Sequence, residues 1–133
     1  MERKPGYRYL QLILILMGFL VGCGGGEEGQ TLPTKMLEWT PPSSYADGTP
    51  LDPASDLDRY EIYLNQDGNF NESLNEVAAV RAVDSSNGRA TTSFDLANLS
   101  RNITIGTKYF VSIRSVTKSG SKSGFSPSAA FSY

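Results

Sequence analysis

The sequence contains no histidine, one cysteine (Cys23) and one tryptophan (Trp39). Without histidine, the chain lacks the commonest general base, the commonest metal ligand and one member of every Ser/His or Cys/His nucleophile pair. A single cysteine cannot form an intramolecular disulfide. The composition therefore argues against an enzyme, and neither a cofactor nor a metal ion is expected.

Positive charge is also scarce. The 133 residues include 12 Lys+Arg and 14 Asp+Glu, which gives a net charge of −2. No basic excess is available to neutralise phosphates, so nucleic acid is not an expected partner. Only 20% of the residues are charged and 11% are aromatic, a composition that favours a packed domain over a disordered tail. The length predicts one such domain.

The N-terminus combines a short cationic segment with an apolar run. Three basic residues lie within the first eight positions, and the run from Leu10 to Val21 follows them. This pattern is typical of a secretory signal peptide. A helix that crosses the hydrocarbon core needs about 20 consecutive apolar residues, and this run is shorter. We therefore expect residues 1–22 to be a signal peptide that is removed.

The apolar run ends in Leu-Val-Gly-Cys at residues 20–23, which resembles the lipobox of bacterial lipoproteins. In that family the Cys thiol is acylated with diacylglycerol, and signal peptidase II cuts directly before the Cys. The resemblance implies that Leu20, Val21 and Gly22 are recognised by the peptidase. It also implies that Cys23 carries the lipid. Two or three acyl chains, at about 0.8 kcal/mol per buried methylene, anchor a protein stably.

Residues 23–31 follow the predicted cleavage site and are rich in glycine and acid, so we expect a flexible tether after the lipidated Cys. In enteric bacteria, Asp directly after the lipidated Cys favours retention in the inner membrane. This chain has Gly24 at that position, so it resembles a lipoprotein that is sorted to the outer membrane. Cleavage leaves 9 basic and 13 acidic residues, a net charge of −4. Anionic lipids repel such a surface, so the lipid should supply the membrane contact. The expected location is the bacterial cell envelope, at the outer membrane, on a face that the sequence leaves open.

Residues 32–133 contain short runs rich in β-branched and aromatic residues, separated by clusters of Gly, Pro, Asn, Asp and Ser. This spacing predicts an all-β sandwich, and no helix is expected. The six runs are Lys35–Thr40, Asp58–Asn65, Asn75–Asp84, Thr91–Leu96, Lys108–Lys118 and Ser128–Ser132.

Two of these runs, at residues 60–64 and 109–116, alternate as half-buried strands do. The alternation and the lone tryptophan predict a structural core, which consists of Trp39, Tyr60, Ile62, Tyr109, Val111 and Ile113. The opposite phase directs Glu61, Ser112 and Arg114 toward water.

Several motifs resemble the fibronectin type III domain, in the right order along the chain. Leu-Glu-Trp-Thr-Pro-Pro at residues 37–42 resembles the second strand of that domain, and residues 60–63 resemble the third. Residues 103–109 are similar to the family's Leu-x-Pro-Gly-Thr-x-Tyr corner, with Ile103 and Ile105 in place of Leu and Pro. The resemblance implies a seven-stranded antiparallel immunoglobulin-like sandwich, in which the Tyr109 hydroxyl bonds to upstream backbone. Leu99 competes with Ile103 for the core position before the corner.

Two clusters allow a second interpretation. Four aromatic residues fall in loops or on the outward phase and would grip a sugar or peptide if they formed an exposed patch; they are Tyr63, Phe70, Phe110 and Phe125. Four aspartates crowd the loop from Asp47 to Asp58, where they either favour turns in a solvated loop or hold calcium.

The fibronectin type III fold itself implies no activity, because its members are spacers and binding modules. We therefore expect a lipid-anchored envelope module that contacts protein or polysaccharide, with strand faces or edges supplying the contacts as in β-strand addition. The alternative is a non-catalytic spacer or accessory subunit of a secreted or envelope complex.

Overall fold

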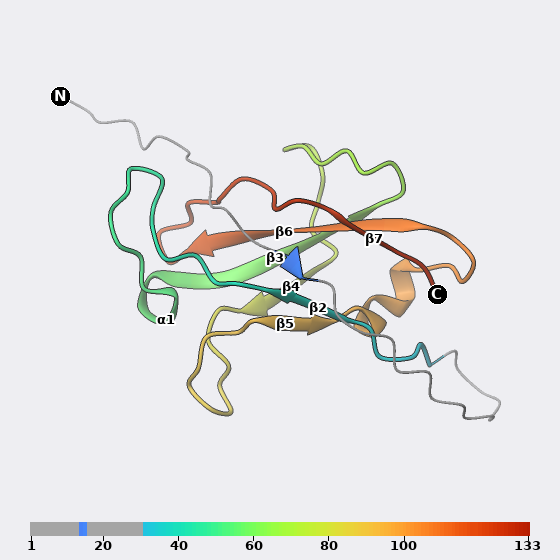
Figure 1. Ribbon diagram of the computed structural model, residues 1–133, viewed down its shortest axis with the longest axis horizontal. Helices are drawn as coiled ribbons and strands as arrows, with labels where there is room; N and C mark the ends of the chain where they lie inside the picture. Colours follow the sequence, from blue (N-terminus) through green and yellow to red (C-terminus); the bar gives the residue numbers. More distant parts are fainter. Residues whose placement is uncertain (1–13, 16–30) are drawn as a thin grey trace.

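The computed structural model describes residues 14–15 and 31–133 (Figure 1). In chain order its elements are β1 (Leu14–Ile15), β2 (Met36–Trp39), α1 (Pro53–Asp56), β3 (Leu57–Asn65), β4 (Ala78–Arg81), β5 (Ser93–Asp95), the 3₁₀ helix η1 (Leu96–Asn102), β6 (Tyr109–Thr117) and β7 (Ala129–Phe131).

The strands form two antiparallel sheets. One sheet has three strands in the order β1-β2-β5, and the other has four in the order β4-β3-β6-β7. Each of the six predicted runs coincides with one strand. β3 begins one residue before its run, and the other five strands are shorter than theirs. The long pair β3 and β6 forms the centre of the four-stranded sheet, with Ile62 opposite Ile113 and Leu64 opposite Val111. The expectation of a mostly β fold with two antiparallel sheets is confirmed.

The core lies between the two sheets and contains all six residues that the alternation and the lone tryptophan assigned to it, which are Trp39, Tyr60, Ile62, Tyr109, Val111 and Ile113. Trp39 from β2 and Tyr60 from β3 pack with their ring centroids 5.0 Å apart. Because these rings come from different sheets, this contact joins the two layers.

The corner before β6 brings the chain back against the core. The hydroxyl of Tyr109 accepts a hydrogen bond from the backbone N–H of Thr104 at 2.9 Å, which is the upstream contact that the resemblance implied. Gly106 makes the turn possible with a φ of +85°, a conformation that side chains with a Cβ rarely adopt. Leu99 is buried and Ile103 is only half-buried, so Leu99 fills the core position more completely.

Two short helices lie where the sequence analysis expected none. The side chain of Asp52 caps α1 by accepting from the N–H of Ala54 at 3.0 Å, and Pro53 occupies the first turn. Asp95 caps η1 in the same way. Both helices are too short to show a 3.6-residue apolar period, which is the signal that reveals a helix in a sequence. No helix in the described part of the chain is long and apolar enough to cross a membrane.

β1 lies inside the segment that was interpreted as a signal peptide and was not expected to be a strand. Leu14 pairs with Trp39 and Ile15 pairs with Glu38, antiparallel to β2. The predicted lipidation residue Cys23 and the peptidase recognition residues 20–22 lie outside the described residues.

Candidate functional site: a covered polar face of the four-stranded sheet

The face of the four-stranded sheet that points away from the core is called the outer face. The prediction that Glu61, Ser112 and Arg114 face water on this side is wrong, because all three are buried. Residues 118–128, called the covering segment, run along β6 on the side opposite β3, next to the part that β7 pairs with. The N–H of Ser123 donates to the carbonyl of Ser115 at 2.9 Å, one of several backbone bonds that hold the segment there. Side chains of this segment then reach over the outer face.

Glu61 is the centre of one cluster on the outer face. Its carboxylate accepts from Arg59 at 2.8 Å, from Lys122 at 2.9 Å and from the hydroxyl of Tyr63 at 2.6 Å. Burial alone raises the pKa of Glu61, but the hydrogen bonds from Tyr63, Lys122 and Arg59 outweigh burial and lower the pKa overall. Burial and the bond to Glu61 raise the pKa of Tyr63 to about 12. Glu61 is therefore a carboxylate held charged by its neighbours.

Arg114 is the centre of a second cluster. Its guanidinium donates to both oxygens of Glu72, at 2.8 and 3.0 Å, and its Nε donates to the carbonyl of Ser123 at 2.7 Å. The guanidinium also lies over the ring of Phe125, 4.5 Å from the ring centroid. The Arg114 side chain is 7% exposed, whereas the Glu72 side chain is 78% exposed. The hydrogen bond from Arg114 lowers the pKa of Glu72.

Two serines complete the covering of β6. Ser126 accepts from the N–H of Ile113 at 2.9 Å through its hydroxyl, and its carbonyl accepts from the hydroxyl of Ser112 at 2.8 Å. Ser112 is thus buried with its hydroxyl bonded, as a buried polar group requires.

The four aromatic residues do not form the exposed patch. Tyr63 is buried, and Phe70, Phe110 and Phe125 are half-buried. Phe125 packs edge to face on Tyr63 with centroids 4.9 Å apart, and Phe70 lies 5.8 Å from Phe125. The rings of Tyr63 in β3, Phe70 in the loop after β3 and Phe125 in the covering segment therefore pack these three parts together.

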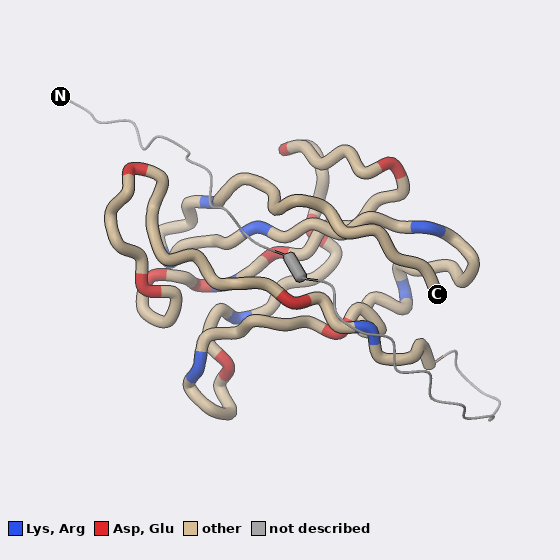
Figure 2. The backbone as a smooth tube through the Cα atoms, in the orientation of Figure 1, with Lys and Arg blue, Asp and Glu red and all other residues tan. Residues whose placement is uncertain are grey.

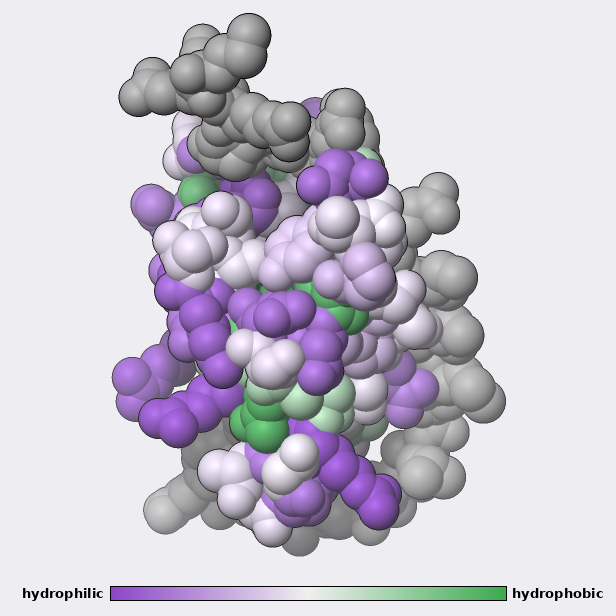
Figure 3. Space-filling view, turned by 90° about the vertical axis from the view of Figure 1, so that its left-hand side faces the viewer, coloured by the Kyte–Doolittle hydropathy of each residue, from purple (hydrophilic) through white to green (hydrophobic). Residues whose placement is uncertain are grey.

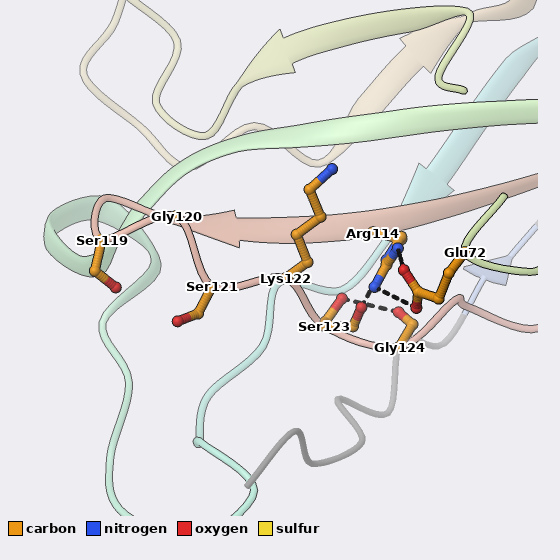
Figure 4. Close-up of a pocket in the computed structure, with 8 residues that line it drawn as sticks. All are labelled: Glu72, Arg114, Ser119, Gly120, Ser121, Lys122, Ser123 and Gly124. Atoms are coloured by element: carbon orange, nitrogen blue, oxygen red, sulfur yellow. Dashed lines mark hydrogen bonds and ion pairs between the residues drawn. The ribbon is translucent and has the colours of Figure 1, made fainter. Parts of the chain in front are cut away.

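A surface pocket of about 760 Å³ lies beside this cluster and is lined by Glu72, Arg114 and residues 119–124 (Figure 4). Figure 4 shows the Arg114 and Glu72 side chains pointing toward each other at one end, while the serine-rich stretch forms the remaining wall. Hydroxyls, backbone and a paired guanidinium suit hydrogen bonding to a polar ligand.

The aspartates between β2 and β3 are spread over local roles. Asp47 accepts from the N–H and hydroxyl of Thr49, Asp52 caps α1, and Asp58 pairs with Arg59 at 2.7 Å. Within residues 31–133, no three acidic side chains gather as ligands for a metal ion. The solvated-loop interpretation therefore fits these contacts, and the calcium interpretation gains no support from them.

Positions of Lys and Arg are interspersed with positions of Asp and Glu along the described chain (Figure 2). The face seen in Figure 3 is largely hydrophilic, with small separate hydrophobic areas.

Comparisons with models of protein families, with curated proteins and with solved structures each found no match to this chain.

Sequence reasoning missed the clusters around Glu61 and Arg114. Alternation places a residue on a face but says nothing of what covers that face. One signal was present: Tyr63 shares the outward phase with Glu61, and a buried Tyr usually finds a hydrogen-bond partner for its hydroxyl.

Proposed function

We propose that this chain is the precursor of a bacterial lipoprotein, anchored through Cys23, whose single fibronectin type III domain at residues 32–133 is a non-catalytic binding or structural module of the cell envelope. The observation that carries the proposal is the position of Cys23. It is the only cysteine, it ends the Leu-Val-Gly-Cys motif, and a glycine-rich tether separates it from the β domain.

The fold supports the family assignment. In a fibronectin type III domain, a three-stranded sheet packs on a four-stranded sheet, and a tyrosine near the start of a central strand bonds to upstream backbone. The four-stranded order β4-β3-β6-β7 and the pairing of β2 with β5 agree with that arrangement, as does the bond from Thr104 to the Tyr109 hydroxyl. The third strand of the smaller sheet, β1, comes from the segment before Cys23, which cleavage would remove. Trp39 in the core fits the second strand of the family.

A role in contact without catalysis is supported by the chemistry. The chain has no histidine, and lipidation would consume its one thiol. In the described part, the buried carboxylate of Glu61 accepts from three donors, and the buried guanidinium of Arg114 donates to Glu72 and Ser123. These groups hold the covering segment in place.

The anchor is tested by the intact mass of the protein extracted from membranes. We expect an acylated species that begins at Cys23, and we expect it to disappear in Cys23→Ala. An unlipidated mass, with residues 1–22 retained or cut elsewhere, would overturn the anchor.

The role of the module is tested separately by extraction in mild detergent. Saturable binding of the lipoprotein to envelope protein or polysaccharide supports a binding module. Co-purification with one stoichiometric partner favours the alternative of an accessory subunit or spacer.

A further inference from the structure

The two edges of β2 are covered by different parts of the chain. On one side lies β5, and the N–H of Trp39 donates to the carbonyl of Thr92 at 2.9 Å. Successive residues of an antiparallel strand direct their backbone groups to alternate sides. The N–H and C=O of Glu38 therefore point the other way, toward β1.

β1 covers that second edge, with Ile15 opposite Glu38 and Leu14 opposite Trp39. Both β1 residues lie within the proposed signal peptide. Within residues 31–133, no strand pairs with this edge of β2. Cleavage before Cys23 would therefore remove the strand that covers it and expose the backbone groups of Glu38.

We propose that this edge of β2 in the mature lipoprotein accepts an extended segment of a partner protein as an added antiparallel strand, in the register that β1 takes in the precursor. The inference rests on the proposed function, because it requires cleavage before Cys23. Strand addition draws affinity from backbone hydrogen bonds and specificity from alternate side chains.

The neighbours of the edge define the chemistry of the added strand. Residues directly opposite each other on antiparallel strands share a face of the sheet. Trp39 faces the core and is 4% exposed, so the residue opposite it must be apolar. Glu38 lies on the other face and is half-buried, so a basic residue opposite it is favoured. The expected motif is an apolar residue followed directly by Lys or Arg.

Two features restrict the occupant further. Pro33 and Pro41 bound the edge, and a proline has no N–H to donate, so the acceptor is short. A second copy of β2 pairing about Glu38 would set two carboxylates opposite each other, which is destabilising. Both features favour a short segment of another protein, with an apolar residue followed by a basic one, over self-association.

The probe is a synthetic peptide of residues 11–17 with the change Ile15→Lys, and its matched control carries Ile15→Glu. Labelled peptide is titrated against the acylated mature protein in detergent, and hydrogen exchange is followed at residues 36–40. We expect the Lys peptide to bind several-fold more tightly than the Glu peptide and to slow exchange at Glu38. In Glu38→Lys protein the preference should reverse.

A backbone variant separates strand addition from simple charge attraction. Glu38→Pro removes the N–H that faces the added strand and leaves the bond between Trp39 and Thr92 intact. We expect it to lose at least tenfold in peptide binding, whereas Glu38→Gln loses only the several-fold preference for the Lys peptide. Equal binding by these two variants overturns the inference, as does equal affinity of the wild type for the Lys and Glu peptides. If Glu38→Pro fails to fold, the charge reversal decides alone.

Failure of the inference is distinguishable from failure of the anchor. An acylated mature protein that binds neither peptide, or that pairs only with itself, overturns strand addition and leaves the lipoprotein assignment standing. Lipidation is read independently by mass.

Discussion

The two faces of the four-stranded sheet are both buried, yet their chemistry differs. The core face presents apolar and aromatic side chains such as Tyr60, Ile62 and Val111. The outer face presents Glu61 and Arg114, which are buried almost as completely. One face is stabilised by the apolar area it removes from water. On the other face, pairing offsets the cost of burying the charges, and the loss of one partner would be destabilising.

Each face of the four-stranded sheet constrains the structure in a different way. Apolar packing is non-directional, so the core tolerates repacking as long as its volume is kept. A buried charge must find its partner, because an unpaired one is costly. Glu61 and Arg114 therefore fix where the covering segment lies, through Lys122 and Ser123 respectively. Substitutions on the core face should therefore lower stability the most. Substitutions at the exposed rim of the outer face, where Glu72 lies, should lower it the least.

Trp39→Ala should have the largest effect, because it removes the ring that joins the two sheets. Replacement of a buried Trp by Ala costs about 3–5 kcal/mol, against a total stability of about 5–15 kcal/mol for a typical domain. Equilibrium unfolding in denaturant measures the loss. Trp39→Phe keeps an aromatic ring and should lose less. A Trp39→Ala protein within about 0.5 kcal/mol of wild type, the usual range for surface substitutions, would contradict the core assignment.

Glu61→Ala should come next, because it removes the carboxylate that accepts the hydrogen bond of the Tyr63 hydroxyl on the buried outer face. Loss of a partner for a buried polar group costs about 1–3 kcal/mol. Arg59 and Lys122 are each 38% exposed and regain water, which keeps the loss below that of the core variant. Glu76→Ala, at an exposed position, is the matched control and should change stability by less than about 0.5 kcal/mol. Equal effects of the two variants would refute the structural role of Glu61.

Alternation in the sequence predicted the core face of the four-stranded sheet but not the burial of its outer face. The apolar phase of β3 and β6 identified Tyr60 and Ile113 as core, because a strand with one apolar side must bury that side. The burial of Arg114 depended on the covering segment, whose path is determined by contacts between residues far apart in the sequence. The pairing of β1 with β2 was missed for a related reason, since an apolar run carries no sign of which strand edge it will meet.

Stability should also depend on pH through the outer face. The pKa values of Glu61 and Glu72 are lowered from 4.5 in the folded protein. A carboxylate with a lowered folded pKa contributes stability above the unfolded pKa and loses it as pH falls through the folded pKa. The wild type should therefore lose stability as the pH is lowered below about 4.5. Glu61→Gln should show a shallower loss than wild type in unfolding curves recorded from neutral to acidic pH. An identical pH profile for both proteins would contradict the charged state of Glu61.

Glu72→Gln should have the smallest effect, because it alters only the exposed end of the Arg114 cluster. The Glu72 side chain is 78% exposed, and ion pairs of this kind contribute about 0–1 kcal/mol. Arg114 keeps its bond to the carbonyl of Ser123 and its position over the ring of Phe125, so its guanidinium stays placed. Denaturant unfolding of Glu72→Gln beside Glu61→Ala measures the contrast. A loss for Glu72→Gln as large as that for Glu61→Ala would mean that the rim, and not the buried centre, holds the covering segment against the sheet.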